Sequence, residues 1–336
     1  MKLFACRCGN LVHFENDRCI ACQARLAFAP ERDAMVAFDA EPPRTHRLCK
    51  NNLDHQACNW LVSAGDQDPF CTACRLNEVI PDLSDPDGRA AWLKIEQAKR
   101  RLVYTLISWR LPLASKSEDP KEGLGFAFLK RVDSGPPVLT GHEDGLITLN
   151  IAEADDPFRE STRQNLGETY RTLLGHFRHE SGHYYWFRIV RNDTALLNAF
   201  RALFGDESVA YDGALKSHYG AGERAGWETE HVSAYAAVHP WEDWAETWAH
   251  YLHMWDTMET AAAFGLSLGP RLPASTDLVT RSFEQLLAGW PALTLAINGL
   301  NRAMGLRDAY PFAPSEKVVT KLRFVHELVA RFRART

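Results

Sequence analysis

The chain has 336 residues, a formal net charge of −5 and an apolar fraction of 46%. This length is enough for one large domain or two to three smaller ones, and the composition is that of a globular protein with a sizeable core. The acidic balance gives no support for a polyanion partner, so nucleic-acid binding is not expected. Because no run of residues is long and apolar enough for a membrane span or a signal peptide, we expect a cytoplasmic protein.

All eight cysteines lie within the first 74 residues. In a reducing compartment such a cluster indicates metal ligation rather than disulfides. The first four cysteines form two closely spaced pairs, and two such turns facing each other make a tetrahedral four-sulfur zinc site. The second four contain one similar pair, but their first half is irregular, so His46 and His55 stay open as alternative ligands. The first set is Cys6, Cys8, Cys19 and Cys22, and the second is Cys49, Cys58, Cys71 and Cys74.

The rest of the chain is predicted to be α+β, with more helix than strand. A turn-rich stretch after residue 80 leads to a predicted amphipathic helix over 89–111, which Pro112 ends. The basic run at 99–101 is expected to be a solvated helix face rather than a nucleic-acid contact. The later elements are expected as strands over 126–132 and 146–152, a helix from 156 to about 190 with an interruption near Gly167, a helical region up to 226, a long helix over 240–265, and two or three helices over 276–333.

An H-E-x-x-H motif, formed by His179, Glu180 and His183, lies in the predicted helix that ends near residue 190. Residues four apart lie on one face of a helix, so both imidazoles can reach one zinc ion. Glu180 follows the first histidine and sits beside the open coordination position. There it can take a proton from zinc-bound water and pass it to the leaving amine. A catalytic site of this kind needs a third protein ligand.

The helix predicted from residue 240 supplies two candidates for that ligand, Glu242 and Glu246. They share a helix face, so one carboxylate can bind zinc while the other orients a ligand histidine through its free ring N–H. Three further histidines, His176, His250 and His253, are expected to be structural groups near the cleft. The strand predicted over 146–152 is expected to border the cleft and to pair with an extended substrate.

The segment around Glu242 resembles the Glu-x-x-Ala-Glu helix of lethal-factor-like gluzincins. In that family the first glutamate is the zinc ligand and the second supports a ligand histidine, which implies Glu242 as the ligand and Glu246 as the support. The family also places a tyrosine seven residues before the ligand glutamate, and Tyr235 stands there in this sequence. Its phenol could donate a hydrogen bond to the oxyanion of the tetrahedral intermediate, with His231 as an alternative donor.

Longer motifs carry a resemblance over nearly the full length of the chain. The chain resembles the zinc-binding metallopeptidase family of bacteria that carries an N-terminal zinc ribbon. This resemblance implies peptidase-type zinc chemistry without naming a substrate. The motifs are Cys58-Asn-Trp-Leu-Val, Glu96-Gln-Ala-Lys-Arg-Arg-Leu-Val-Tyr-Thr-Leu, Gly141-His-Glu-Asp-Gly-Leu-Ile-Thr-Leu-Asn-Ile, Tyr170-Arg-Thr-Leu-Leu-Gly-His-Phe-Arg-His-Glu-Ser-Gly-His and His239-Pro-Trp-Glu-Asp-Trp-Ala-Glu-Thr-Trp-Ala-His.

Together these features predict a predominantly helical α+β, gluzincin-like metallopeptidase domain over 116–336. A zinc-ribbon region over 1–80 and a linker helix within 81–115 precede it. We expect one catalytic and one or two structural Zn²⁺ ions, a peptide or protein substrate, and a protein partner bound through the zinc-ribbon region. Two alternatives stay open: a zinc hydrolase of a non-peptide amide, and a non-catalytic binding or regulatory protein that zinc holds together.

Overall fold

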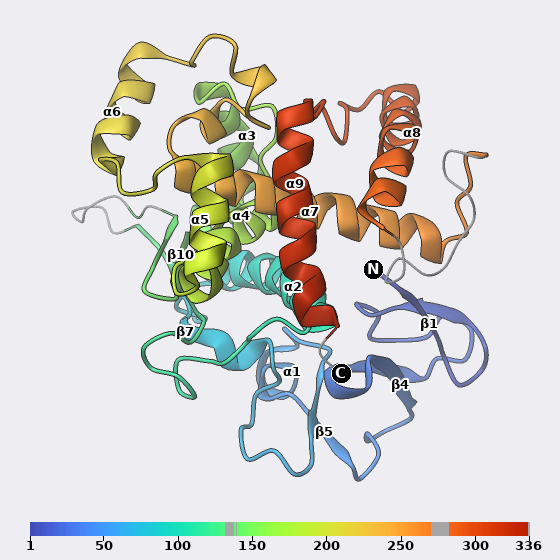
Figure 1. Cartoon of the computed structure of the whole chain (residues 1–336). Helices are drawn as coiled ribbons and strands as arrows, with labels where there is room; N and C mark the ends of the chain where they lie inside the picture. Colours follow the sequence, from blue (N-terminus) through green and yellow to red (C-terminus); the bar gives the residue numbers. More distant parts are fainter. Residues whose placement is uncertain (132–137, 139, 270–281, 335–336) are drawn as a thin grey trace.

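The computed structural model describes residues 1–131, 138, 140–269 and 282–334. Three small hairpins lie at one end of the molecule, and most of the helices lie at the other, with α2 (Pro86–Ser108) between them (Figure 1). This arrangement is the predicted one, a cysteine-rich region followed by a predominantly helical α+β part. Within the described ranges, no helix has the length and apolar character that crossing a membrane requires.

The three hairpins are antiparallel, and the cysteines lie in the turns of two of them and in the segments that follow. Each hairpin is only three to five residues long on a side, too short to bury a core without help. A short helix, α1 (Lys50–His55), lies inside the third hairpin. The hairpins pair β1 (Leu3–Ala5) with β2 (Leu11–His13), β3 (Arg25–Ala29) with β4 (Ala34–Phe38), and β5 (His46–Leu48) with β6 (Leu61–Ser63).

The eight thiols form two groups of four, and within each group all sulfur atoms lie within 4.8 Å of one another. In the first group the Sγ atoms of Cys6 and Cys22 are 3.6 Å apart, and in the second those of Cys58 and Cys71 are 3.7 Å apart. All eight cysteines are free of disulfides. The groups are the two predicted sets, Cys6, Cys8, Cys19 and Cys22, and Cys49, Cys58, Cys71 and Cys74.

The two histidines that were alternative ligands of the second thiol group lie outside it. The ring Nε2 of His46 is 2.6 Å from a carboxylate oxygen of Glu31. His55 packs edge-on against Trp92, with 5.6 Å between the ring centroids. The second group therefore consists of four cysteines, the same ligand set as the first.

The two thiol groups differ in how they are packed. The first group has a small core of its own, and two of its cysteines, Cys8 and Cys22, are exposed. In the second group all four cysteines are buried, and they belong to the same continuous core as Trp60 and Trp92. A metal ion in the second group would therefore stabilise the main core, whereas one in the first would stabilise only a local knuckle.

A four-stranded sheet and eight longer helices complete the described fold. The sheet has the strand order β7-β8-β10-β9, in which β10 pairs parallel with β8 and antiparallel with β9. The strands are β7 (Asn77–Val79), β8 (Gly125–Leu129), β9 (Gly141–Glu143) and β10 (Leu146–Asn150). The helices besides α2 are α3 (Asp156–Asn165), α4 (Leu173–Tyr185), α5 (Thr194–Phe204), α6 (Tyr211–Ala221), α7 (Pro240–Ala263), α8 (Phe283–Ala303) and α9 (Glu316–Arg333).

Most of the predicted elements are present, and the interruption of the long helix is larger than expected. The chain leaves the helix at Gly167, where φ is +68°, and re-enters it only at Thr172. The hydroxyl of Thr172 accepts a hydrogen bond from the Gly175 amide at 2.9 Å and so caps α4. The helix that carries the H-E-x-x-H motif is therefore a separate, capped element. Parts of two predicted elements, at 132 and at 276–281, lie outside the described residues.

The predicted solvated face at residues 99–101 is wrong. Lys99 is fully buried and lies 2.8 Å from the Glu96 carboxylate, and Arg100 is buried beside the second thiol group. Arg101 pairs with Glu15 at 2.8 Å. Lys99 and Arg100 are inside the molecule because the Glu96 carboxylate lies beside both and supplies the opposite charge that a buried cation needs, whereas Arg101 is only half-buried. The helix expected as a linker, α2, is thus a core element.

The helices α4 and α7 approach each other closely at Gly182. A Cβ atom added there would lie 2.9 Å from the Cα atom of Ala245, so only glycine fits. Two indole N–H groups of α7 bridge the same contact. Trp244 donates to the Gly182 carbonyl at 2.8 Å, and Trp248 donates to the Ser181 hydroxyl at 3.0 Å. This contact fixes how far apart the two helices lie.

A buried polar network joins the same two helices to α2. Arg178 of α4 donates to one carboxylate oxygen of Asp256 of α7 at 2.6 Å. Thr105 of α2 donates to the other oxygen, also at 2.6 Å. Because both carboxylate oxygens of Asp256 accept hydrogen bonds, one from α4 and one from α2, the network ties the three helices together.

We expect Gly182→Ala to destabilise the protein by about 1–3 kcal/mol, because the new methyl group forces α4 and α7 apart. The control is Gly299→Ala in α8, where an added Cβ meets nothing within 4 Å. That change should be neutral or stabilise by roughly 0.5–1 kcal/mol. Urea unfolding of both variants measures the difference, and equal midpoints would show that the close contact is not required.

We expect Cys74→Ser and Cys22→Ser to have unequal effects. A structural zinc ion contributes roughly 10–16 kcal/mol to folding of a small zinc domain, about as much as a whole domain's net stability. Cys74→Ser should therefore disrupt the helical part, while Cys22→Ser should lose one ion and keep the helices. Metal analysis and circular dichroism test this, and full helix content in both variants would contradict it.

Candidate active site

Three side chains of the two predicted motifs converge at one point between α4 and α7. The ligand atoms of His179, His183 and Glu242 all lie within 4.8 Å of one another. The Nε2 atom of His179 is 3.2 Å from Nε2 of His183 and 3.0 Å from Oε2 of Glu242. The Nε2 atom of His183 is 3.5 Å from Oε1 of Glu242. The structure thus brings together two imidazole nitrogens and one carboxylate.

This donor set fits a metal ion. The Oε2 atom of Glu242 is buried and accepts no hydrogen bond from the described residues. A carboxylate oxygen in that condition is costly unless a cation neutralises it. The two Nε2 atoms of His179 and His183 also face each other, and a cation between them could accept both lone pairs. Two histidines and one glutamate are a ligand set of catalytic zinc sites.

The two candidate glutamates of α7 take different places. Glu246 lies behind His179, with its Oε1 atom 2.7 Å from the ring Nδ1. The other oxygen of Glu246 accepts a hydrogen bond from the Ser233 hydroxyl at 2.7 Å. Because Nδ1–H of His179 donates to Glu246, the lone pair of the neutral imidazole is on Nε2, which faces Glu242 and His183. Glu242 is therefore in the cluster, and Glu246 orients one of its members.

The charges of the cluster reinforce one another. Burial lowers the pKa of His179, but the carboxylates of Glu242 and Glu246 outweigh burial and hold that pKa well above its ordinary value, so a metal ion that binds Nε2 has to displace a proton. Burial raises the pKa of Glu242, yet His183 and His179 hold it well below the ordinary value. Glu242 is therefore ionised, which is the form that binds a cation.

Glu180 lies in the same helical turn as the two histidines. It is buried, with a relative exposure of 6%, and its Oε2 atom has no hydrogen-bond partner among the described residues. An unpaired carboxylate oxygen beside this cluster is available to accept a proton from a bound water.

Two tyrosines lie at the cluster, and only one was predicted. Tyr235 begins a short 3-10 turn ahead of α7, and its ring centroid is 6.0 Å from that of His179. Tyr211, the first residue of α6, donates a hydrogen bond to Oε1 of Glu242 at 2.7 Å. Burial and then the charge of Glu242 raise the pKa of Tyr211, while a hydrogen bond with Tyr235 lowers it. No sequence motif marks Tyr211, because only the fold brings it to Glu242.

The remaining histidines near the site lie outside the cluster, and each has another partner among the described residues. Such contacts are typical of structural histidines, which is how three of these four were predicted. His231 Nδ1 is 3.1 Å from the Asp243 carboxylate, His176 Nε2 is 3.2 Å from Glu153, His250 Nδ1 is 2.9 Å from the Tyr310 hydroxyl, and the His253 ring centroid is 5.2 Å from that of Tyr310.

The strand predicted over 146–152 is present as β10, but its expected pairing with a substrate is wrong because β10 has a neighbouring strand on each side, β8 and β9. Among the described strands, β9 is the edge of the sheet on the side of α4. On β9, the ring of His142 lies 5.8 Å from that of Phe187, between centroids, and 6.0 Å from that of Tyr184. The edge strand of the sheet therefore runs next to the helix that carries the histidines.

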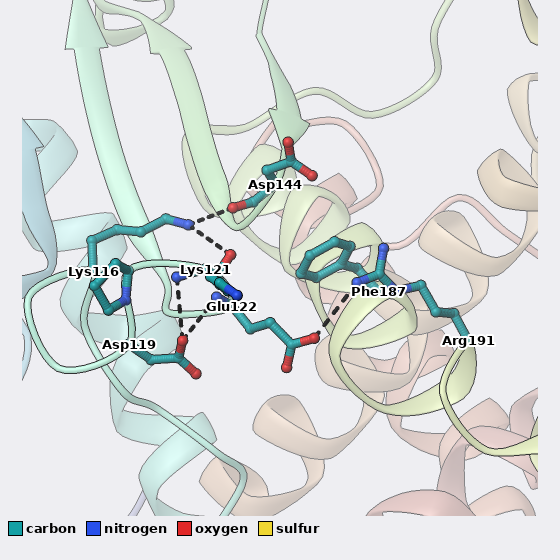
Figure 2. Close-up of a pocket in the computed structure, with 8 residues that line it drawn as sticks. Lys116, Asp119, Lys121, Glu122, Asp144, Phe187 and Arg191 are labelled. Carbon is teal, nitrogen blue, oxygen red and sulfur yellow. Dashed lines mark hydrogen bonds and ion pairs between the residues drawn. The ribbon is translucent and has the colours of Figure 1, made fainter.

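A pocket of about 620 Å³ lies beyond the end of β9 (Figure 2). Phe187 and Arg191, in and directly after the π-helical turn Trp186–Val190 that follows α4, line one wall. The guanidinium of Arg191 stacks on Phe187, 3.7 Å from the ring centroid. The opposite wall is the loop that carries Lys116 and Glu122.

Comparisons with known proteins agree with these features. The sequence model of a family described as "putative zinc-binding metallo-peptidase" matches residues 88–328, and that of a zinc-ribbon domain matches residues 3–85. Uncharacterized proteins of Mycobacterium bovis and Mycobacterium tuberculosis are each 40% identical over 332 residues, which is 98% of this chain and 95% of the relative. No solved structure matches the chain.

The peptidase match includes α4, α7 and all three members of the cluster, and the zinc-ribbon match includes all eight cysteines. The chain therefore belongs to this family of zinc-binding metallopeptidases and carries the zinc ribbon ahead of its peptidase part.

Proposed function

We propose that the protein hydrolyses peptide bonds with a zinc ion held by His179, His183 and Glu242. One observation carries the proposal. In the described ranges, each thiol group offers four ligands, whereas this cluster offers three. Structural zinc sites are closed by four protein ligands, and catalytic sites keep a position open for water or substrate. The three-ligand cluster is therefore the catalytic candidate.

The residues around the cluster have complementary roles in this proposal. Zinc, when bound, lowers the pKa of water toward ~7 and polarises a carbonyl oxygen. Glu180 accepts the proton of the attacking water and transfers it to the leaving amine. Tyr235 donates a hydrogen bond to the developing oxyanion. Glu246 holds the imidazole of His179 in the tautomer that the site requires.

The proposed substrate is a peptide in an extended conformation. β9 is an edge strand among the described residues, and its outer side offers backbone groups to which such a chain can add as a further strand. The pocket past the end of β9 would receive one of its side chains. We further propose that the eight thiols hold two structural zinc ions, so that the protein binds three, and that it works in the cytoplasm, where the thiols stay reduced.

We expect Glu180→Gln to bind the same amount of zinc as the wild type and to cleave peptides about 10²- to 10⁴-fold more slowly, because the amide cannot accept the proton. Mass spectrometry of a peptide mixture before and after incubation measures the cleavage. The control is Glu228→Gln, an exposed position outside the cluster that should leave the rate unchanged. A Glu180→Gln variant that cleaves as fast as the wild type would contradict the role of Glu180 as the proton acceptor.

We expect Tyr235→Phe to lower kcat by about 10²- to 10³-fold with little change in KM, because a hydrogen bond to the oxyanion forms only in the transition state. Steady-state kinetics on one cleaved peptide separate the two constants. An increase in KM with an unchanged kcat would instead place Tyr235 in ground-state binding.

A further inference from the structure

The two oxygens of Glu242 have different surroundings. Oε2 lies 3.0 Å from Nε2 of His179 and accepts no hydrogen bond from the described residues. Oε1 accepts a hydrogen bond from the Tyr211 hydroxyl at 2.7 Å. One oxygen is therefore left for a cation, and the other is already taken by a phenol.

Tyr211 is held in place by the residues at the start of α7. Its ring packs edge-on against His239, with 5.1 Å between centroids, and lies 6.2 Å from the ring of Trp241. His239 caps α7, because its Nδ1 atom accepts a hydrogen bond from the Trp241 amide at 3.1 Å. Its Nε2 atom therefore carries the proton and donates to the Val209 carbonyl, 3.2 Å away and two residues before Tyr211.

The residues next to Tyr211 in the sequence are not part of the buried core. The preceding residues, 206–210, are exposed apart from a half-buried Glu207 at the surface. The described residues that follow in α6 are half-buried or exposed, and 222–226 are all exposed. Of the side chains described in this segment, that of Tyr211 hydrogen-bonds to the cluster.

We propose that Tyr211 is a positioning residue of the zinc site, whose phenol holds Oε1 of Glu242 so that Oε2 alone is presented to the metal. The inference rests on the proposed zinc site. A carboxylate held in this way binds through one oxygen, which leaves a coordination position open. Tyr211 acts through Glu242, unlike Tyr235, which is assigned to the substrate. Groups that hold a ligand in this way are typically worth 10- to 100-fold in metal affinity.

The test measures zinc release from the full-length, zinc-loaded protein to a chromogenic chelator. Tyr211→Phe keeps the ring that packs on His239 and removes only the hydroxyl. Glu242→Ala identifies the ion of the three-ligand cluster as the one it lacks. Tyr251→Phe is the matched control, because it removes a hydroxyl of α7 that bonds His326 Nδ1 at 2.8 Å, away from the cluster.

The expected result is that Tyr211→Phe binds the same three ions but weakens the one missing from Glu242→Ala by about 10- to 100-fold. Tyr251→Phe should match the wild type. If Tyr211→Phe also matches the wild type while Glu242→Ala lacks an ion, the zinc site stands and the role of Tyr211 is overturned. If Glu242→Ala lacks no ion, the proposed zinc site fails, and the inference about Tyr211 fails with it.

Discussion

The close approach of α4 and α7 is the constraint on which the site depends. Gly182 lies between Glu180 and His183, and the backbone of α7 at Ala245 occupies the space that a Cβ atom would need. The contact places the first turn of α7 opposite the two histidines, so that Glu242 reaches both of them. The indole of Trp244 hydrogen-bonds to the backbone at the same place and so resists sliding of one helix along the other. The H-E-x-x-H motif therefore serves two purposes: its histidines face the cluster, and Gly182, at its second variable position, lets the two helices pack closely.

The core that supports these helices continues into the zinc-ribbon region. The second thiol group is buried in the same hydrophobic core as α2, α4 and α7. Arg100 of α2 lies beside its thiols, and Thr105, one turn further along α2, hydrogen-bonds to Asp256 of α7. Asp256 in turn holds Arg178, which directly precedes His179 in the chain. A continuous set of buried contacts thus runs from the second thiol group to the cluster. The first thiol group, with its separate small core, lies outside this set.

Sequence reasoning succeeded where chemistry fixes the spacing of residues. Metal coordination requires closely spaced cysteines and histidines four apart on a helix, so the two thiol groups, the H-E-x-x-H helix and the candidates Glu242 and Glu246 could be named in advance. Sequence reasoning failed where contacts between distant parts of the chain determine which side chains are buried or brought to the site. The run at 99–101 looked solvated because Glu15 and the thiol group that pack against it come from distant parts of the chain. Tyr211 and the edge position of β9 depend on how α6 and the hairpin fold back on the site, which no local pattern records.

The account centres on a zinc ion held by three protein ligands, separate from two zinc ions held by four thiols each. Diffraction from crystals of the zinc-loaded protein, measured on both sides of the zinc absorption edge, tests this most directly. The account predicts three anomalous peaks, one of them between His179, His183 and Glu242 with no fourth protein ligand. The absence of a peak at that point, or a fourth side chain bound to the ion there, would contradict it.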